Sequence, residues 1–316
     1  MFSQSADKMS EKYRIYQLER QNITDKIEAD GVLRKDWYSH PELGACLLKE
    51  ARSPEWDVAD NKDIRTDWSE KVVYEIARLI NIPTAQCELA SGYFDDPTEP
   101  IESIVSINCI PANNTGVVTG ENLLIRNVNG YRSDNLSQYT VENVLNALEL
   151  SEVKLPSNWQ QPIPGIDTGA KLFVGYLMMD AWVINRDRHY RNWGVMAVGN
   201  QIELIPSYDH GLSLGSTERI NLAPERYANR YKAPFQGNHQ QLSTFNAFKR
   251  AAHLYPAAVR IWQEQLAQIS ITQISDIFER IPDSRITPTA AKFAIELLLY
   301  NQQQIVNLEI EPISQR

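Results

Sequence analysis

Two short stretches of this sequence carry side chains suited to phosphoryl transfer. The first is Asn185-Arg186-Asp187-Arg188-His189-Tyr190-Arg191-Asn192, and the second is Tyr208-Asp209-His210-Gly211. Phosphoryl transfer to a hydroxyl needs a carboxylate that accepts a proton and oxygen ligands that hold Mg²⁺ at the phosphates. Asp187, Asn192 and Asp209 supply these groups in that order. A tight loop between the first two residues, followed by a hairpin that leads to the third, would bring all three to one γ-phosphate.

A β-hairpin is expected between the two stretches. The apolar runs 193–198 and 201–205 are separated by Gly199 and Asn200, and Gly-Asn between two such runs is a signal for a two-residue turn. The alternative interpretation of Asp187 and its neighbours is a charged helix end without a role in catalysis. The order and spacing of Asp, Asn and Asp around a hairpin favour the catalytic interpretation.

The two halves of the chain differ in their hydrophobic periodicity. From residue 13 to 110, short apolar runs alternate with turn residues, and one helix is expected from Thr66, with Ser or Asp as its cap, until Pro83 ends it. After about residue 140 the pattern is mostly helical, and residues 172–184 predict a buried helix that leads into the catalytic loop. We therefore predict an α+β, bilobal, protein-kinase-like fold. Its small, mostly antiparallel β lobe spans residues 1–135 and binds nucleotide, and its larger, mostly α-helical lobe spans residues 136–316.

A fold of this kind needs a Lys on a small-lobe strand that reaches the α- and β-phosphates, and a Glu on the next helix that holds the Lys. Lys49 ends an apolar run and Glu70 opens the predicted helix, so their order and separation match this requirement. An exposed Lys at a strand end and a Glu favoured by the helix dipole would produce the same pattern. Glu75, just over one turn further along the helix, is the alternative partner for Lys49.

The phosphates also need a turn that approaches them closely. No Gly-x-Gly-x-x-Gly precedes Lys49, and the best substitute is the stretch 31–37. Gly31 permits a tight turn there, and Arg34 and Lys35 bring positive charge to the nucleotide. A surface hairpin is the equal alternative for this stretch.

Composition fits a folded enzyme. The chain has 316 residues, of which 43% are hydrophobic and 22% charged, with a net charge of −9. Such an acidic chain has little electrostatic support for binding nucleic acid or an anionic membrane, so protein or small-molecule substrates are expected.

The cysteines and the N-terminus predict a cytoplasmic location. Cys46, Cys87 and Cys109 are scattered and form no Cys-x-x-Cys pair, which is typical of reduced core residues and disfavours a zinc site. Residues 1–10 lack the apolar segment of a signal peptide, and no run approaches eighteen apolar residues.

Residues 180–194 and 206–215 resemble the HipA-like kinases, a group that includes bacterial persistence toxins. The resemblance is to their compact branch, whose catalytic loop ends Asp-Arg-His-x-x-Asn-Trp-Gly. It extends more weakly through residues 31–37, Lys49, Glu70, residues 120–124 and the C-terminal helices. No loop like Ser-Gly-Val-Gln-Pro-Lys and no long N-terminal extension, as found in the longer toxins, is present.

The resemblance implies an ATP- and Mg²⁺-dependent kinase that phosphorylates Ser or Thr of a protein, such as an aminoacyl-tRNA synthetase or the kinase itself. It implies Asp187 as the catalytic base, Asn192 and Asp209 as the Mg²⁺ ligands, and Lys49 with Glu70 as the phosphate-binding pair. His189 would brace the catalytic loop. An antitoxin-like partner is implied as well. The two departures from the longer toxins argue against regulation by loop phosphorylation and against an antitoxin bound at those segments.

Three other functions fit parts of the pattern. A pseudokinase would bind nucleotide without turnover, although the residues for metal binding and proton acceptance are all present. A lipid or small-molecule kinase would share the same loops, but no basic membrane-facing run supports a phosphoinositide substrate. A metal-dependent hydrolase built on Asp187, His189 and Asp209 would leave Asn192 and Lys49 without a role.

Overall fold

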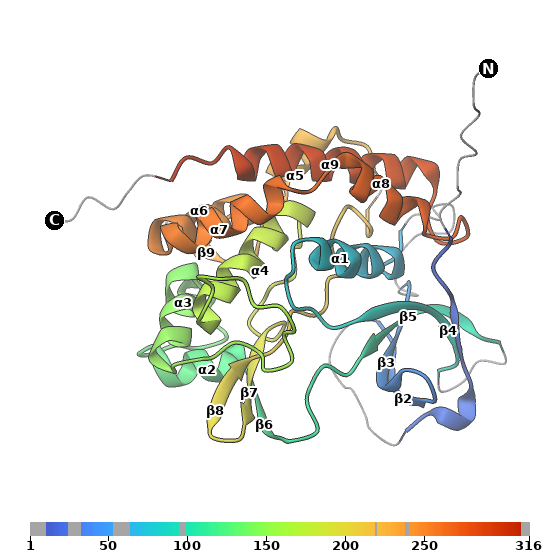
Figure 1. The fold of residues 1–316 in the computed structure, drawn as a ribbon, viewed down its shortest axis with the longest axis horizontal. Helices are drawn as coiled ribbons and strands as arrows, with labels where there is room; N and C mark the ends of the chain where they lie inside the picture. Colours follow the sequence, from blue (N-terminus) through green and yellow to red (C-terminus); the bar gives the residue numbers. More distant parts are fainter. Residues whose placement is uncertain are drawn as a thin grey trace.

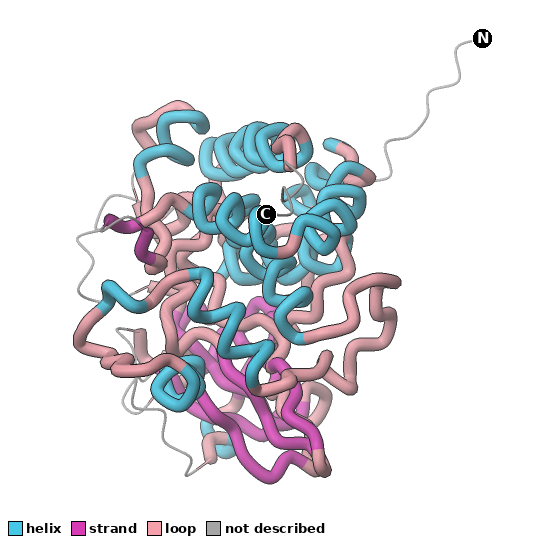
Figure 2. Tube along the Cα trace, turned by 90° about the vertical axis from the view of Figure 1, so that its left-hand side faces the viewer, coloured by secondary structure: helices cyan, strands magenta, loops and turns pink. Residues whose placement is uncertain are grey.

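The computed structural model describes residues 11–24, 33–52, 64–94, 99–218, 220–237 and 240–310. The chain forms a smaller part built on a five-stranded sheet and a larger part made mainly of helices (Figure 1). Figure 2 shows the same division, with most strands gathered at one end of the molecule and most helices at the other.

The smaller part contains one sheet and one long helix. The strand order is β1-β4-β5-β3-β2, and every neighbouring pair is antiparallel except β1 with β4. The elements are β1 (Tyr16–Leu18), the 3₁₀ turn η1 (Arg20–Asn22), β2 (Lys35–His40), β3 (Gly44–Glu50), α1 (Asp67–Leu79), β4 (Cys87–Gly92) and β5 (Ile101–Ile107). The sheet is thus mostly antiparallel, as predicted.

Both faces of this sheet are covered, because side chains alternate along each strand. Leu48 of β3 and Val105 of β5 face a small apolar cluster. Leu89 and Ile104 face the opposite way, into the main core, where the apolar side of α1 packs. Lys49 follows Leu48 and therefore points to the α1 face of the sheet.

Helix α1 begins near the expected residue but is not capped as expected. Thr66 is its N-cap, and no side chain caps the helix. The Asp67 carboxylate instead pairs with Arg65 and Arg285, and the Ser69 hydroxyl donates to the carbonyl of Gly211 at 2.8 Å. The prediction of a Ser or Asp cap is therefore wrong, because tertiary partners engage both side chains.

The larger part is organised around a buried helix. Helix α4 (Gly169–Val183) has almost no exposed residue and contacts four other helices. The sequence predicted such a helix ahead of the catalytic loop, and this is confirmed. The remaining elements are β6 (Asn114–Thr119), α2 (Gly120–Asn127), η2 (Leu136–Gln138), α3 (Val141–Leu150), β7 (Gly194–Val198), β8 (Gln201–Leu204), α5 (Pro224–Arg230), β9 (Gln236–Gly237), β10 (Gln240–Gln241), α6 (Thr244–Leu254), α7 (Pro256–Ala267), α8 (Ile271–Glu279) and α9 (Pro288–Val306).

The predicted hairpin is formed by β7 and β8. Val198 pairs with Gln201 across a two-residue turn in which Gly199 has a φ of 57°. A glycine suits this left-handed backbone, since it carries no Cβ. The hairpin is confirmed, and it separates the two stretches that carry the candidate catalytic residues.

The pairing of β6 bears on the boundary between the two parts. Strand β6 precedes residue 135, yet it pairs with β7, and α2 packs on α3. We propose that the boundary lies between Ile107, where β5 ends, and Asn114, where β6 begins, rather than at residue 135.

No helix in the described ranges is both long enough and apolar enough to span a membrane.

Candidate active site

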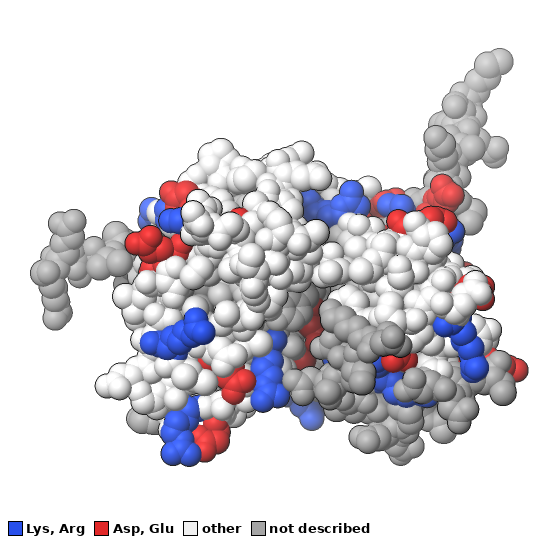
Figure 3. All heavy atoms as spheres, turned by 90° about the horizontal axis from the view of Figure 1, so that it is seen from below, with Lys and Arg blue, Asp and Glu red and all other residues white. Residues whose placement is uncertain are grey.

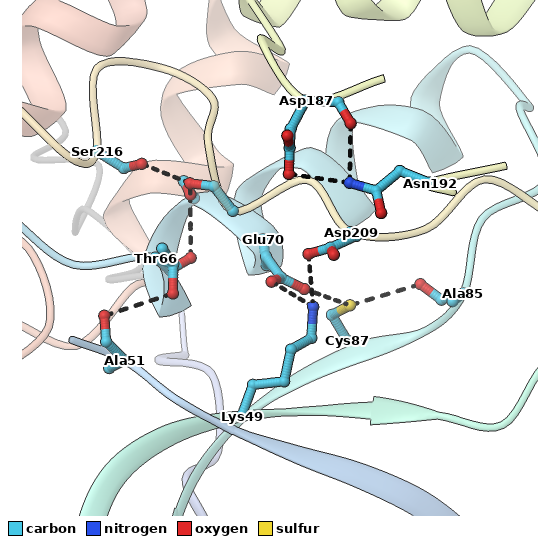
Figure 4. A network of polar contacts seen from close by, with 12 residues as sticks. Lys49, Ala51, Thr66, Glu70, Ala85, Cys87, Asp187, Asn192, Asp209 and Ser216 are labelled. Carbon is cyan, nitrogen blue, oxygen red and sulfur yellow. Dashed lines mark hydrogen bonds and ion pairs between the residues drawn. The ribbon is translucent and has the colours of Figure 1, made fainter. Parts of the chain in front are cut away.

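The predicted catalytic loop follows directly from the end of α4. Ile184 caps this helix with a left-handed backbone, and the chain then turns into Asn185. The Asn192 side-chain amide donates to both the main-chain oxygen and Oδ2 of Asp187, at 2.8 and 2.9 Å. The loop between them is closed by a backbone hydrogen bond from Asn192 to the carbonyl of His189. The two residues predicted to act together are therefore in direct contact (Figure 4).

A buried ion pair under the loop holds its shape. Arg188 donates from Nε and Nη2 to the two carboxylate oxygens of Asp180 on α4, both at 2.8 Å. The Asn185 side chain donates from Nδ2 to Oδ1 of Asp180 and accepts at its Oδ1 from the main-chain nitrogen of Asp187. Arg188 also donates to the carbonyl of Asn192 at 3.1 Å. Sequence reasoning assigned no role to Asp180, because its partners lie five and eight residues further along and meet it only in the folded loop.

His210 lies against this buried ion pair. Its ring nitrogen Nε2 lies 2.8 Å from Ser207 Oγ and 3.4 Å from Nη2 of Arg188. Burial, together with the positive charge of Arg188, holds the pKa of His210 well below its usual range. The ring is therefore neutral near pH 7.

Lys49 lies between two acidic side chains. Its Nζ is 2.7 Å from Oε1 of Glu70 and 2.9 Å from Oδ1 of Asp209, as Figure 4 shows. Burial by itself would lower the pKa of Lys49, but the carboxylates of Asp209 and Glu70 outweigh it and raise this pKa above the usual range. Glu75, the alternative partner, pairs instead with Lys71 at 2.7 Å and with Arg78 at 3.1 Å.

The electrostatic environments of the two candidate aspartates differ. Burial raises the pKa of Asp187, and the negative charge of Asp209 adds to that rise. Burial would also raise the pKa of Asp209, but the ammonium groups of Lys49 and Lys35 hold it below its usual range. Asp209 therefore stays ionised, and Asp187 is the better proton acceptor of the two.

Gly211 allows the Asp209 turn to approach α1. A Cβ added at this position would lie 2.9 Å from Cβ of Thr66 and 3.1 Å from Oε1 of Glu70. The carbonyl of Gly211 accepts hydrogen bonds from the hydroxyls of Ser69, at 2.8 Å, and Ser216, at 2.6 Å. The glycine after Asp-His is thus required by close packing against the helix that carries Glu70.

The predicted phosphate-binding turn is only partly within the described residues. Gly31 lies outside them. The Arg34 guanidinium forms two 2.8 Å hydrogen bonds with the carboxylate of Glu50, so it is engaged within the sheet. Lys35 on β2 lies directly opposite Lys49 on β3 in the strand register, which places both side chains on the same face of the sheet.

Two more residues shape the surroundings of Asp187. His189 Nε2 lies 3.7 Å from Oδ1 of Asp187, and its Nδ1 accepts a hydrogen bond from the backbone of Arg191 at 3.1 Å. Arg186 pairs with Glu218 and donates to the Thr217 hydroxyl at 2.8 Å. Sequence reasoning did not identify Arg186, which connects the catalytic loop to the segment after Asp209.

The oxygen donors of the site fit a magnesium ion. Asn192 uses its amide nitrogen to hold Asp187, so its amide oxygen is the atom left to face a cation. Mg²⁺ is commonly bound by one or two carboxylates together with substrate phosphates, and Asp209 with Asn192 offers hard oxygen ligands of this kind. Within the described ranges, no three His, Cys, Asp or Glu side chains form a group that could hold a metal ion by themselves.

The surface between the two parts is hollowed. Figure 3 shows a recess there, with acidic atoms at its base and Lys or Arg side chains at its rim. This recess separates the helical part from the sheet.

Solved structures share this fold, among them the following two. The Helicobacter pylori proinflammatory kinase CtkA matches with a TM-score of 0.67 over 93% of this chain and 96% of its own, at 15% sequence identity. A chain from the Shewanella oneidensis toxin-antitoxin complex of HipA, HipB and operator DNA matches with a TM-score of 0.55, over 90% of this chain and 68% of its own, at 10% identity. The predicted α+β, bilobal, kinase-like fold is therefore confirmed.

No protein-family model matches this sequence, and no curated protein is similar to it in sequence.

Proposed function

We propose that this protein is a kinase that transfers the γ-phosphoryl group of ATP, with Mg²⁺, to a Ser or Thr hydroxyl of a protein. The observation that carries this proposal is the position of Lys49, whose ammonium bridges Glu70 on α1 and Asp209 in the metal loop. A Lys held by a helix Glu beside a metal-binding Asp is the arrangement that kinases use to position phosphates.

Each candidate residue then has a distinct task. Asp187 accepts the proton of the attacking hydroxyl, and Asn192 keeps its carboxylate oriented through two hydrogen bonds. Asn192 and Asp209 would hold Mg²⁺, which when bound neutralises negative charge that develops on the phosphates. Lys49, kept in place by Glu70, contacts the α- and β-phosphates, and Lys35 adds positive charge on the same face of the sheet.

The acceptor and the partner are proposed from the resemblance to HipA-like kinases. A protein acceptor is consistent with the acidic net charge of the chain. The candidate acceptors are this protein itself and an aminoacyl-tRNA synthetase. The HipA structure contains HipB and operator DNA, which supports an antitoxin-like partner and a toxin-like role. All three cysteines are free, which fits the cytoplasmic location that we propose.

The test is incubation of the purified protein with γ-labelled ATP and Mg²⁺, with label measured on the protein itself, on lysate proteins, on lipid vesicles and as free phosphate. We expect label on protein, and we expect Asp187→Asn to reduce the rate by about 10²- to 10⁴-fold while nucleotide binding persists. Label on lipid alone would identify a lipid kinase, and release of phosphate alone would identify a hydrolase. Nucleotide binding without any transfer would identify a pseudokinase.

A further inference from the structure

A cavity of about 550 Å³ lies outside the candidate active site, where the ends of β3 and β5 meet the segment between α8 and α9. Its lining includes Glu50, Arg65, Glu102 and Arg285. The volume is within the range of about 300 to 1,000 Å³ that is usual for small-molecule sites.

Two of the lining arginines are almost completely buried. Arg65 and Arg285 are 1% and 3% exposed, and both bind the carboxylate of Asp67, which is 0% exposed. Arg65 makes two hydrogen bonds to Asp67, at 2.6 and 2.7 Å, and Arg285 Nη1 makes one at 2.7 Å. Two buried guanidinium groups therefore share one buried carboxylate, and a second negative charge is needed to balance them.

That second charge comes from Glu102, which is loosely placed. Its side chain is 48% exposed, with Oε2 at 2.8 Å from Nη1 of Arg65 and Oε1 at 3.8 Å from Nε of Arg285. The second separation is too long for a hydrogen bond. Nε of Arg285 is thus a buried donor without a hydrogen-bond partner among the described residues.

The other carboxylates of the lining are already engaged. Both oxygens of Glu50 accept hydrogen bonds from Arg34, and Asp283 pairs with Lys12 at 2.7 Å. Glu102 is therefore the lining carboxylate that balances Arg65 and Arg285, and it is the one that an outside anion can replace.

We propose that this cavity binds a small molecule through an oxyanion group, a phosphate or a carboxylate, which takes the place of the Glu102 carboxylate. An oxyanion seated there would contact Arg65 and satisfy Nε of Arg285, and guanidinium groups bind such groups through paired hydrogen bonds. Asp67 is the first residue of α1, so the ligand would contact the ion cluster that anchors the helix carrying Glu70. Binding at this site does not depend on the proposed phosphoryl transfer.

The test measures binding of inorganic phosphate and of acetate to the purified protein, by calorimetry and thermal unfolding without nucleotide. At least one of the two anions should bind the parent, and the comparison tells which oxyanion the site prefers. Glu102→Gln removes the competing carboxylate and should tighten binding about tenfold, the change expected for about 1.4 kcal/mol. Glu42→Gln is the matched control, because Glu42, in the turn between β2 and β3, forms a comparably exposed pair with Arg14, and this variant should bind like the parent.

A second variant tests the arginine directly. Arg285→Lys keeps a positive charge beside Asp67 but removes the Nε donor, so it should weaken anion binding at least several-fold while the protein remains folded by circular dichroism. Equal affinity in the parent, Glu102→Gln and Arg285→Lys would place the anion elsewhere and overturn the proposal. Absence of binding by both anions to the parent and to Glu102→Gln would overturn it as well.

Discussion

Lys49 and Glu70 form a buried ion pair, with Nζ and Oε1 separated by 2.7 Å and both side chains at most 4% exposed. The pair joins β3 to α1 beneath Asp209. Loss of Lys49 would leave the carboxylates of Glu70 and Asp209 together without a cation, and loss of Glu70 would leave Lys49 paired with Asp209 alone, so the position of each group depends on the other.

Non-additive effects on the transfer rate are the first prediction. Lys49→Ala and Glu70→Ala should each lower the rate as much as the double variant does, because either change already destroys the geometry that the other residue supports. Glu75→Ala should combine additively with Lys49→Ala, since Glu75 pairs with Lys71 and Arg78. The rates of the single and double variants provide the measurement, and losses that multiply for Lys49 and Glu70 would show that the two act independently.

A second prediction concerns Asp209, the proposed metal ligand. Asp209→Ala should reduce both transfer and the Mg²⁺-dependent part of nucleotide affinity, because it removes a charge that we place against the ion. Thermal unfolding with ATP, with and without Mg²⁺, measures this effect. Stabilisation by Mg²⁺ and ATP that is as large in the variant as in the parent would contradict the assignment.

Gly211 provides a prediction about packing. Gly211→Ala should destabilise the protein by about 1 to 3 kcal/mol, since the new methyl group would press on Thr66 and Glu70. Transfer should fall as well, because α1 must shift. Gly116→Ala is the control, as a Cβ there meets nothing within 4 Å. Chemical unfolding and rate measurements on both variants check the prediction, which fails if the two behave alike.

A fourth prediction is that breaking the contact between Arg186 and Glu218 lowers kcat selectively. Glu218→Gln should lower kcat by about tenfold with little change in the KM for ATP, because a small misplacement of the loop beside Asp187 affects the reacting geometry more than nucleotide binding. Glu225→Gln, an exposed acid on α5, should leave both constants unchanged. A change in the KM for ATP alone would place the effect of Glu218 in nucleotide binding.

Stability should depend on pH through His210. Its pKa is lowered in the folded protein, so the unfolded chain binds more protons and stability is lost as pH falls below about 6.5, the ordinary histidine value. This loss is at most about 1.4 kcal/mol per pH unit for one group. His210→Gln should flatten the dependence between about pH 6.5 and 5, whereas His253→Gln, at an exposed position, should not. Unfolding free energies measured across this range decide the matter.

The sequence by itself determined the order of the elements and the local chemistry of the loops. Residues 172–184 are apolar on nearly all sides, so they had to form a buried helix, and Gly199-Asn200 between apolar runs required a turn. The contact of Asp187 with Asn192 also follows from local spacing, because five residues of tight loop bring the two side chains together. These features depend on short-range geometry, which a sequence expresses directly.

Only the tertiary structure decided which charges meet. Glu70 and Glu75 lie on the same helix, and the packing of α1 against the sheet places the first at Lys49 on β3, whereas the second pairs with Lys71 one turn earlier on α1 itself. The prediction that Asp67 caps α1 was wrong because its carboxylate accepts a hydrogen bond from Arg285, 218 residues further along the chain. Buried polar groups are satisfied wherever the fold brings a partner, and sequence separation says little about that distance. The positions of β6 beside β7, of Arg186 beside Glu218 and of the arginine-lined cavity depend on the same long-range packing.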